Sequence, residues 1–115
     1  TTIAGSGEAS DADGVGDAAE FYNPRGIVIS PDGGALFVAD QYNNKIQRVE
    51  VATGAVTTVA GSGTRGSADG VSDAAELDQP VEVAISPDGS TLFVGSYGGL
   101  RQVCVAAPPP PPSFA

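Results

Sequence analysis

Several residue types are absent or scarce in this sequence of 115 residues. It contains no histidine, methionine or tryptophan, and Cys104 is its single cysteine. A cysteine–histidine nucleophile pair therefore cannot form within the chain, and the acidic residues lie mainly in predicted loops, so we do not expect an enzyme. A single cysteine also excludes an internal disulfide framework. No apolar run reaches about 18 residues, so no membrane span is expected.

Positive charge is scarce as well. Five Lys and Arg residues accompany fourteen Asp and Glu residues, which gives a formal net charge of −9. Nucleic acid is not an expected partner, because its phosphates are bound by clusters of cationic side chains. The sequence begins at Thr1 without an initiator methionine, which indicates a processed product or a portion of a longer chain.

The apolar residues that are present predict short strands. Residues 23–61 contain four apolar runs rich in Val, Ile, Thr and Phe, at residues 26–29, 36–39, 46–51 and 56–60. Such residues favour strands, and the Gly, Asn, Asp and Pro residues between the runs favour tight turns. The pattern predicts a four-stranded antiparallel meander, with strands a, b, c and d in chain order.

Part of this pattern recurs later in the chain. The sequence SPDG at residues 30–33 returns at 86–89, LFV at 36–38 returns at 92–94, and AGSG at 4–7 returns at 60–63. Each pair is offset by 56 positions, and a repeat of about this length indicates a solenoid or propeller, because one meander cannot bury both its faces alone. Residues 83–86, 92–95 and 100–105 are the expected strands a, b and c of a second meander.

The segment VADQYNNKIQRV at residues 38–49 resembles the NHL repeat, a β-propeller blade written as V-A-D, two or three residues, Asn, one residue, Arg-Ile. Asp40, Asn43 and Ile46 match this pattern, and Lys45 replaces the usual Arg. The resemblance covers about residues 1–105 and implies an all-β fold of two four-stranded antiparallel blades, the second without its own outer strand. It implies little about function. In this family Asp40 and Asn43 would hold the b–c turn together.

Residues 1–5 copy residues 57–61, so they correspond to a strand d. We expect a spare outer strand at residues 1–5, a first repeat with its connector at 6–61, an incomplete second repeat at 62–105 and a polyproline tail at 106–115. Two interpretations remain open. In the first, the sequence is a portion of a longer closed propeller, cut so that it begins with a strand d. In the second, the spare strand completes the last blade of another copy. The assembly residues would be Thr1, Thr2, Ile3 and Ala4 on one copy and Val103, Cys104 and Val105 on the other.

The connector at residues 6–24 carries four acidic residues, Asp11, Asp13, Asp17 and Glu20, around helical turns expected at residues 16–21. Their spacing offers oxygen ligands for calcium, although it is not the spacing of the EF-hand loop. The copy at residues 62–80 loses the first Asp, so ordinary turn structure is the preferred interpretation and calcium is the alternative. No other cofactor is expected.

Five prolines and a serine form most of the tail: Pro108, Pro109, Pro110, Pro111, Pro112 and Ser113. Consecutive prolines favour an extended polyproline II spacer. The tail also resembles the hydroxyproline-rich glycoproteins of plant and green-algal extracellular matrix, and this resemblance implies hydroxylated prolines that carry O-linked sugars, with galactose on the serine. Such glycans would place the protein outside the cell or at its surface.

These observations predict a structural subunit of an extracellular glycoprotein fibre or matrix, assembled head-to-tail from copies of itself, with glycans as further partners. The alternative is a propeller module that binds proteins or glycans. Cys104 is expected to be a buried, unreactive thiol, and an intermolecular disulfide is the alternative. The residues expected to pack within or between the blades are Ile27, Ile29, Phe37, Val38, Ile46, Val49, Val83, Ile85, Phe93 and Val94.

The tail provides a first test. In protein from the native source, intact-mass and peptide analysis should find hydroxylation and pentose or hexose additions on Pro108, Pro112 and the prolines between them. An unmodified tail would remove the argument for a matrix glycoprotein and leave a spacer.

Overall fold

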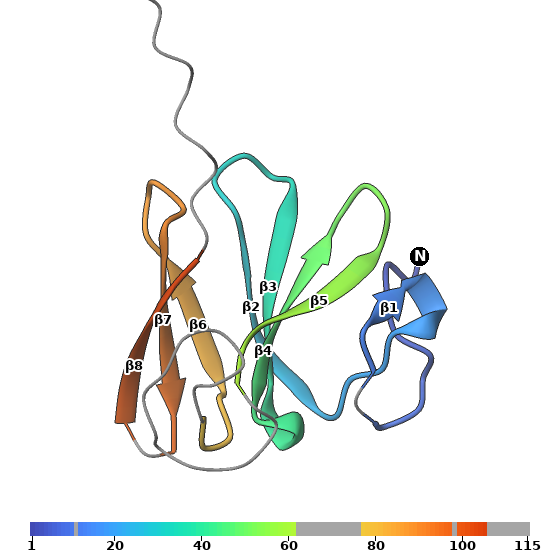
Figure 1. Ribbon diagram of the computed structural model, residues 1–115, viewed down its shortest axis with the longest axis horizontal. Helices are drawn as coiled ribbons and strands as arrows, with labels where there is room; N and C mark the ends of the chain where they lie inside the picture. The colour runs from blue at the N-terminus through green and yellow to red at the C-terminus, as the bar shows by residue number, and fades with distance from the viewer. Residues whose placement is uncertain (11, 62–76, 98, 106–115) are drawn as a thin grey trace, which may run out of the picture.

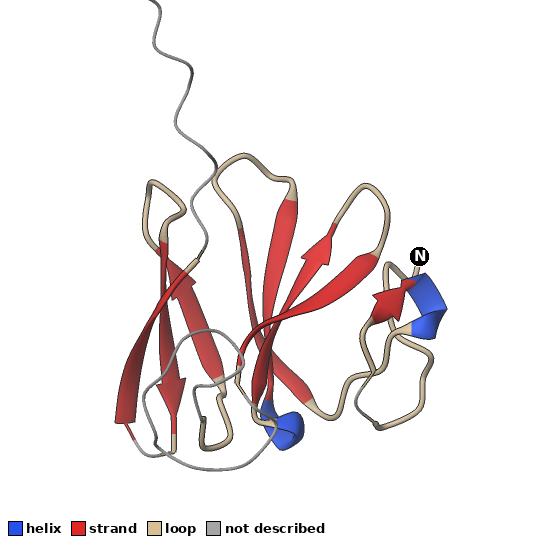
Figure 2. Cartoon of the chain, in the orientation of Figure 1, coloured by secondary structure: helices blue, strands red, loops and turns tan. Residues whose placement is uncertain are grey.

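The computed structural model describes residues 1–10, 12–61, 77–97 and 99–105, without the side chain of Asp17. These residues form two antiparallel sheets and two short 3-10 turns (Figure 2). The predicted all-β fold with two blade-like sheets is therefore confirmed.

The first sheet contains the predicted four-stranded meander, which we call the first blade. Its strands are β2 (Pro24–Ile29), β3 (Ala35–Asp40), β4 (Lys45–Glu50) and β5 (Ala55–Ala60), and each pairs with the next in sequence. The side chain of Asp32 closes the turn between β2 and β3, because its Oδ1 accepts hydrogen bonds from Ser30 Oγ (2.7 Å) and from the backbone N–H of Gly34 (2.8 Å). Such Asp-centred turns explain why SPDG ends a strand.

A further strand, β1 (Gly14–Val15), pairs with the outer edge of β5 and lies in the connector, where the sequence analysis predicts no strand. The carboxylate of Asp13 supports this pairing by accepting a hydrogen bond from the backbone N–H of Thr58 at 3.1 Å. After β1 comes η1 (Gly16–Ala18), which is a single 3-10 turn. The sequence predicts one or two helical turns here, so the helix is shorter than expected.

The second sheet, or second blade, consists of β6 (Glu82–Ile85), β7 (Thr91–Ser96) and β8 (Gly99–Cys104). Its register repeats that of the first blade: Leu92 lies opposite Val103, as Leu36 lies opposite Val49. Within the described ranges, β7 is the sole strand neighbour of β8. The three-stranded second blade thus agrees with the sequence-based prediction.

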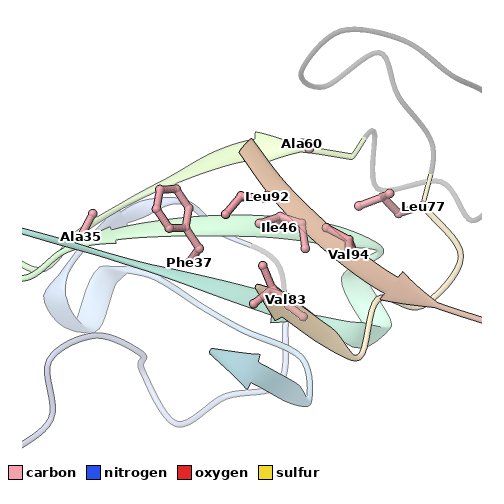
Figure 3. Close-up of a cluster of buried hydrophobic side chains, with 9 residues drawn as sticks. Ala35, Phe37, Ile46, Ala60, Leu77, Val83, Leu92 and Val94 are labelled. Carbon is pink, nitrogen blue, oxygen red and sulfur yellow. The ribbon is translucent and has the colours of Figure 1, made fainter. Parts of the chain in front are cut away.

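The two blades lie side by side, and the first blade lies between the second blade and the N-terminal segment (Figure 1). Contacts between the blades are concentrated on β2 and β6. The larger apolar cluster fills the space between the sheets and contains Phe37 and Ile46 from one blade and Leu92 and Val94 from the other (Figure 3). A smaller cluster, around Val38, Val49 and Val56, lies on the opposite side of the first blade.

The predicted core is correct in part. Phe37, Val38, Ile46, Val49, Val83 and Val94 are buried, and Ile85 packs partly buried against the larger cluster. The prediction is wrong for three residues in the single chain, because Ile27, Ile29 and Phe93 keep 60%, 53% and 49% of their surface exposed. These three lie on the two blade faces that have no neighbouring sheet among the described residues.

Close packing at Gly26 gives a stability test. A Cβ at this position would lie 2.7 Å from the Val81 carbonyl oxygen and 2.8 Å from the Cα of Glu82. Gly26→Ala should therefore force β2 and β6 apart and lower the free energy of unfolding by about 1–3 kcal/mol, as overpacking does. At Gly95 the nearest atoms to an added Cβ are 3.6 Å and 3.9 Å away, so Gly95→Ala is the matched control. Thermal unfolding followed by circular dichroism measures both, and equal melting temperatures would contradict the packing argument.

Candidate functional site

Strand alternation divides the side chains of each blade between two faces. The N-face of the first blade is the side that bears Ile27, Ile29, Leu36, Val38 and Val49; its C-face bears Val28, Phe37, Ala39 and Ile46. The second blade has a corresponding N-face, formed by Val83, Ile85, Leu92 and Val94, and a C-face, formed by Ala84, Phe93, Leu100 and Cys104.

The N-face of the first blade is open. Ile27 and Ile29 are more than half exposed on it. Residues 1–4 lie along this face and leave a largely apolar groove of about 320 Å³ between themselves and the blade. The groove is lined by Phe21 of the connector and, on the blade side, by Pro24, Ile27, Leu36, Val38 and Val49.

The C-face of the second blade is open as well. Phe93 is 49% exposed and Leu100 is 87% exposed. Cys104 shares this face and is also exposed, so the expectation of a buried thiol is wrong in the single chain. The physical reason is that Cys104 points away from the first blade, whereas its neighbours Val103 and Val105 pack against the larger cluster.

Equivalent residues of the two repeats have opposite environments. Ile27 is exposed, whereas its counterpart Val83 is buried against the first blade. On the C-faces, Phe93 is exposed whereas its counterpart Phe37 is buried, and Leu100 is exposed whereas its counterpart Ile46 is buried. The N-face of the second blade therefore packs on the C-face of the first. The remaining two faces are the corresponding pair of surfaces, and neither has a neighbouring sheet among the described residues.

A polar network holds the turn that follows β3. The turn is η2 (Gln41–Asn43), and the buried carboxylate of Asp40 accepts hydrogen bonds from Asn43 Nδ2 at 2.8 Å and from the backbone N–H of Tyr22 at 2.7 Å. The predicted structural role of Asp40 and Asn43 is confirmed. The rings of Tyr22 and Tyr42 pack edge to face at 5.2 Å beside this turn.

Gln41 connects the two blades at the same end, and the sequence argument misses it. Its buried amide accepts a hydrogen bond from Asn23 Nδ2 at 2.8 Å and donates to Gln79 Oε1 and to Tyr97 Oη, both at 3.2 Å. Asn23 and Gln79 occupy equivalent positions before a proline, and both have positive φ angles of 60° and 48°. A polar residue directly before a proline at the same position of both repeats was the sequence signal from which this network could have been predicted.

The acidic residues considered for calcium are only partly described. The carboxylate of Asp13 is bonded to Thr58, and Glu20 Oε2 accepts a hydrogen bond from Ser6 Oγ at 3.3 Å. Asp11 lies outside the described residues, as does the side chain of Asp17. The part of the chain that is described contains no group of three His, Cys, Asp or Glu residues placed to hold a metal ion. Calcium binding stays a prediction.

The tail residues proposed for glycosylation, Pro108 to Pro112 and Ser113, lie outside the described residues as well. In the part of the chain with a description, no helix is long and apolar enough to cross a membrane.

A second groove, of about 450 Å³, lies between the two SPDG turns, with Arg48 and Val105 in its lining. Each turn holds its aspartate in the same way: Ser86 Oγ donates to Asp88 Oδ1 at 2.6 Å, as Ser30 does to Asp32. The hydrogen bonds from Ser86 and Ser90 lower the pKa of Asp88 from the usual 3.8 to about 2, and those from Ser30 and Gly34 lower the pKa of Asp32. Both groups are exposed, and their role is to close the turns.

Similar proteins are consistent with the blades described above. Residues 21–49 match the NHL repeat. The chain is 38% identical over 84 residues to Protein SUPPRESSOR OF QUENCHING 1, chloroplastic, of Arabidopsis thaliana, and 35% identical over 85 residues to NHL repeat-containing protein 2 of Bos taurus. Each match covers 73% of this chain, but the chain spans only 8% and 12% of those two proteins.

A solved structure shares the fold. The crystal structure of an auxiliary nutrient binding protein from Bacteroides thetaiotaomicron superposes with a TM-score of 0.71 at 27% identity, covering 84% of this chain and 26% of that one. The sheets and these likenesses define a pair of β-propeller-type blades. Within that class, residues 21–49 match the NHL repeat.

The turn aspartates give a pH test. Because the pKa of Asp88 is lower in the folded than in the unfolded chain, its stabilising contribution is complete above about pH 3.8 and is lost as the pH falls towards 2. Ser86→Ala should move the pKa of Asp88 back towards 3.8, which the NMR titration of its carboxyl carbon would report. Ser30→Ala is the matched control, since it should change Asp32 alone. An unchanged Asp88 titration in Ser86→Ala would refute the role of the serine.

Proposed function

We propose that the protein is a structural subunit of an extracellular glycoprotein fibre or matrix, and that its copies assemble head-to-tail through their blades with donation of a β-strand. The observation that carries this proposal is the pair of open faces. Ile27 on one face and Phe93 on the other are exposed, although the equivalent residues Val83 and Phe37 are buried where the two blades meet.

The two open faces correspond to the pair of faces that already meet within the chain, with Glu82 in the second blade at the position of Gly26. An open C-face of one copy would meet the open N-face of the next as Phe37 and Ile46 meet Leu92 and Val94 within the chain. Burial of one Ile, Leu or Phe side chain contributes about 1.5–3 kcal/mol, so three or four such residues support a stable contact. Donor and acceptor are different surfaces, and contacts of that kind form a ring or continue into a filament.

The rest of the proposal depends on composition. An acidic surface with a net charge of −9 keeps the repeating units soluble between contacts, and the proline tail would carry the glycans. A tail on every subunit would coat the assembly with sugar. We propose an extracellular or cell-surface location on this basis, and a role without catalysis.

A second function is favoured by the comparisons. The chain spans a small share of its relatives, so further blades of a longer chain are an alternative cover for the same faces. In that case the chain would be part of a closed propeller that binds proteins or glycans. The similarity to an auxiliary nutrient binding protein supports this alternative at the level of the fold.

Assembly of the isolated chain distinguishes the two functions. The wild-type protein should form polymers in sedimentation and in negative-stain micrographs. Ile27→Asp and Phe93→Asp should each abolish polymers, because each places a charge in the contact. A mixture of the two variants should stop at dimers, since Phe93→Asp keeps a working N-face and Ile27→Asp keeps a working C-face.

Tyr42→Asp is the matched control, because Tyr42 is 51% exposed and lies in η2, not in a strand of either face. It should polymerise like the wild type. A wild-type chain that remains monomeric at high concentration would contradict the structural role and favour the binding module.

A further inference from the structure

Residues 1–4 lie against the first blade in the same way that the end of β5, which belongs to the first blade, lies against the second blade. Ala4 packs against the cluster that contains Val38 and Val49, beside Phe21. Its counterpart Ala60 belongs to the cluster that contains Val94, beside Leu77. Since Val94 and Leu77 are the repeat counterparts of Val38 and Phe21, residues 1–4 already occupy the position of a strand d in front of the first blade.

The backbone supports the same equivalence. Gly5 has a φ angle of 113°, and its counterpart Gly61 has a φ angle of 102°, a conformation that favours glycine. The backbone N–H of Gly5 donates to the Gly16 carbonyl at 3.0 Å, and that of Ser6 donates to the Ala19 carbonyl at 2.9 Å. These bonds fix one end of the segment, so its place over the N-face is set within the chain.

The segment differs from β5 in one respect. β5 is hydrogen-bonded along β4, whereas residues 1–4 belong to no strand, and their backbones make no hydrogen bond to another described residue. At the far side of the molecule, β8 has β7 alone as a strand neighbour among the described residues (Figure 1). The chain thus contains residues 1–4, which resemble a strand d but pair with no described sheet. It also contains β8, whose outer edge pairs with no further described strand.

We propose that residues 1–4 of one copy form the fourth strand of the second blade of another copy, antiparallel to β8 and in the register of β4 and β5. This inference rests on the proposed head-to-tail assembly and specifies its pairing. In the first blade Ile46 lies opposite Ala60, Gln47 opposite Thr58 and Arg48 opposite Thr57, with Val59 in a bulge. The corresponding pairs between copies are Ala4 with Leu100, Thr2 with Arg101 and Thr1 with Gln102, with Ile3 in the bulge.

The orientation of Ala4 selects this register. Ala4 faces the first blade of its own copy. Opposite Ala4, Leu100 of the other copy would point to the same face and cover the exposed Ile27, as Ile46 covers the equivalent Val83 within the chain. A slip by one residue would turn the alternate side chains to the wrong face.

The space around Gly5 agrees with this arrangement. A Cβ on Gly61 would overlap the carbonyl oxygen of Asn44, because the turn before β4 approaches it closely. Around Gly5, Phe21 is the one described residue within van der Waals distance of such a Cβ. No described turn approaches Gly5 as the turn before β4 approaches Gly61, and in the proposed register Gly99 of the other copy would take that place.

Disulfide trapping tests the register in the full chain. In a Cys104→Ser background, Ala4→Cys with Leu100→Cys should form disulfides between copies under mild oxidation, because directly opposed residues lie about 4.5–5.5 Å apart at Cα. Denaturing gels without reductant should then show a ladder of dimers, trimers and larger species. Ala4→Cys with Gln102→Cys is the matched control, since its cysteines lie two residues out of register, and its ladder should be lost.

The possible results separate the inference from the proposed function. Polymers like those of the wild type without an Ala4–Leu100 ladder, or with equal ladders in both pairs, would overturn the register and leave head-to-tail assembly standing. Polymers that persist after deletion of residues 1–4 would also overturn it. A disulfide within a single chain would show closure instead of donation. A chain that folds by circular dichroism but forms neither polymer nor ladder would overturn both proposals.

Discussion

The contact between an N-face and a C-face is the interaction on which the rest of this structure depends. Each meander has apolar side chains on both sides, so no single blade can bury its own surface. The two blades satisfy this requirement once, between Phe37 and Ile46 on one side and Leu92 and Val94 on the other. When sheets are stacked in a row, each added sheet buries one face and exposes another. Ile27, Phe93 and Leu100 are therefore exposed on the two end faces of this pair of blades.

Polar groups complete the contact at one end of the blades. Gln41 is almost fully buried, and its amide bonds to residues that precede β2, precede β6 and follow β7. An apolar contact alone permits sliding, because it is not directional. Hydrogen bonds have a preferred geometry, so this amide fixes the alignment of the second blade relative to the first. The described chain leaves no buried side-chain nitrogen or oxygen without a partner.

The strands and their order were predictable because they depend on local signals. Turns such as SPDG end a strand through bonds within five residues, and the repeat offset aligned the second blade with the first. Which faces are buried was not predictable, because the exposure of Ile27 and Phe93 depends on how many blades stand in a row. The pairing of β1 with β5 and the network of Gln41 also escaped prediction, since their partners lie between 18 and 56 positions apart along the chain. Among the candidate site residues, the sequence identified residues 1–4 by their likeness to β5, and the structure adds the face on which they lie.

The contact between β2 and β6 also has a geometric consequence. The blades touch mainly along these two strands, and Gly26 allows the backbones to approach there more closely than any side chain would permit. Each blade therefore acts as a wedge whose thin edge is at β2 or β6. A row of wedges curves about the side of its thin edges. At the contact within the chain, the absence of a side chain at position 26 tightens that curve, whereas Glu82 occupies the equivalent position of the second blade.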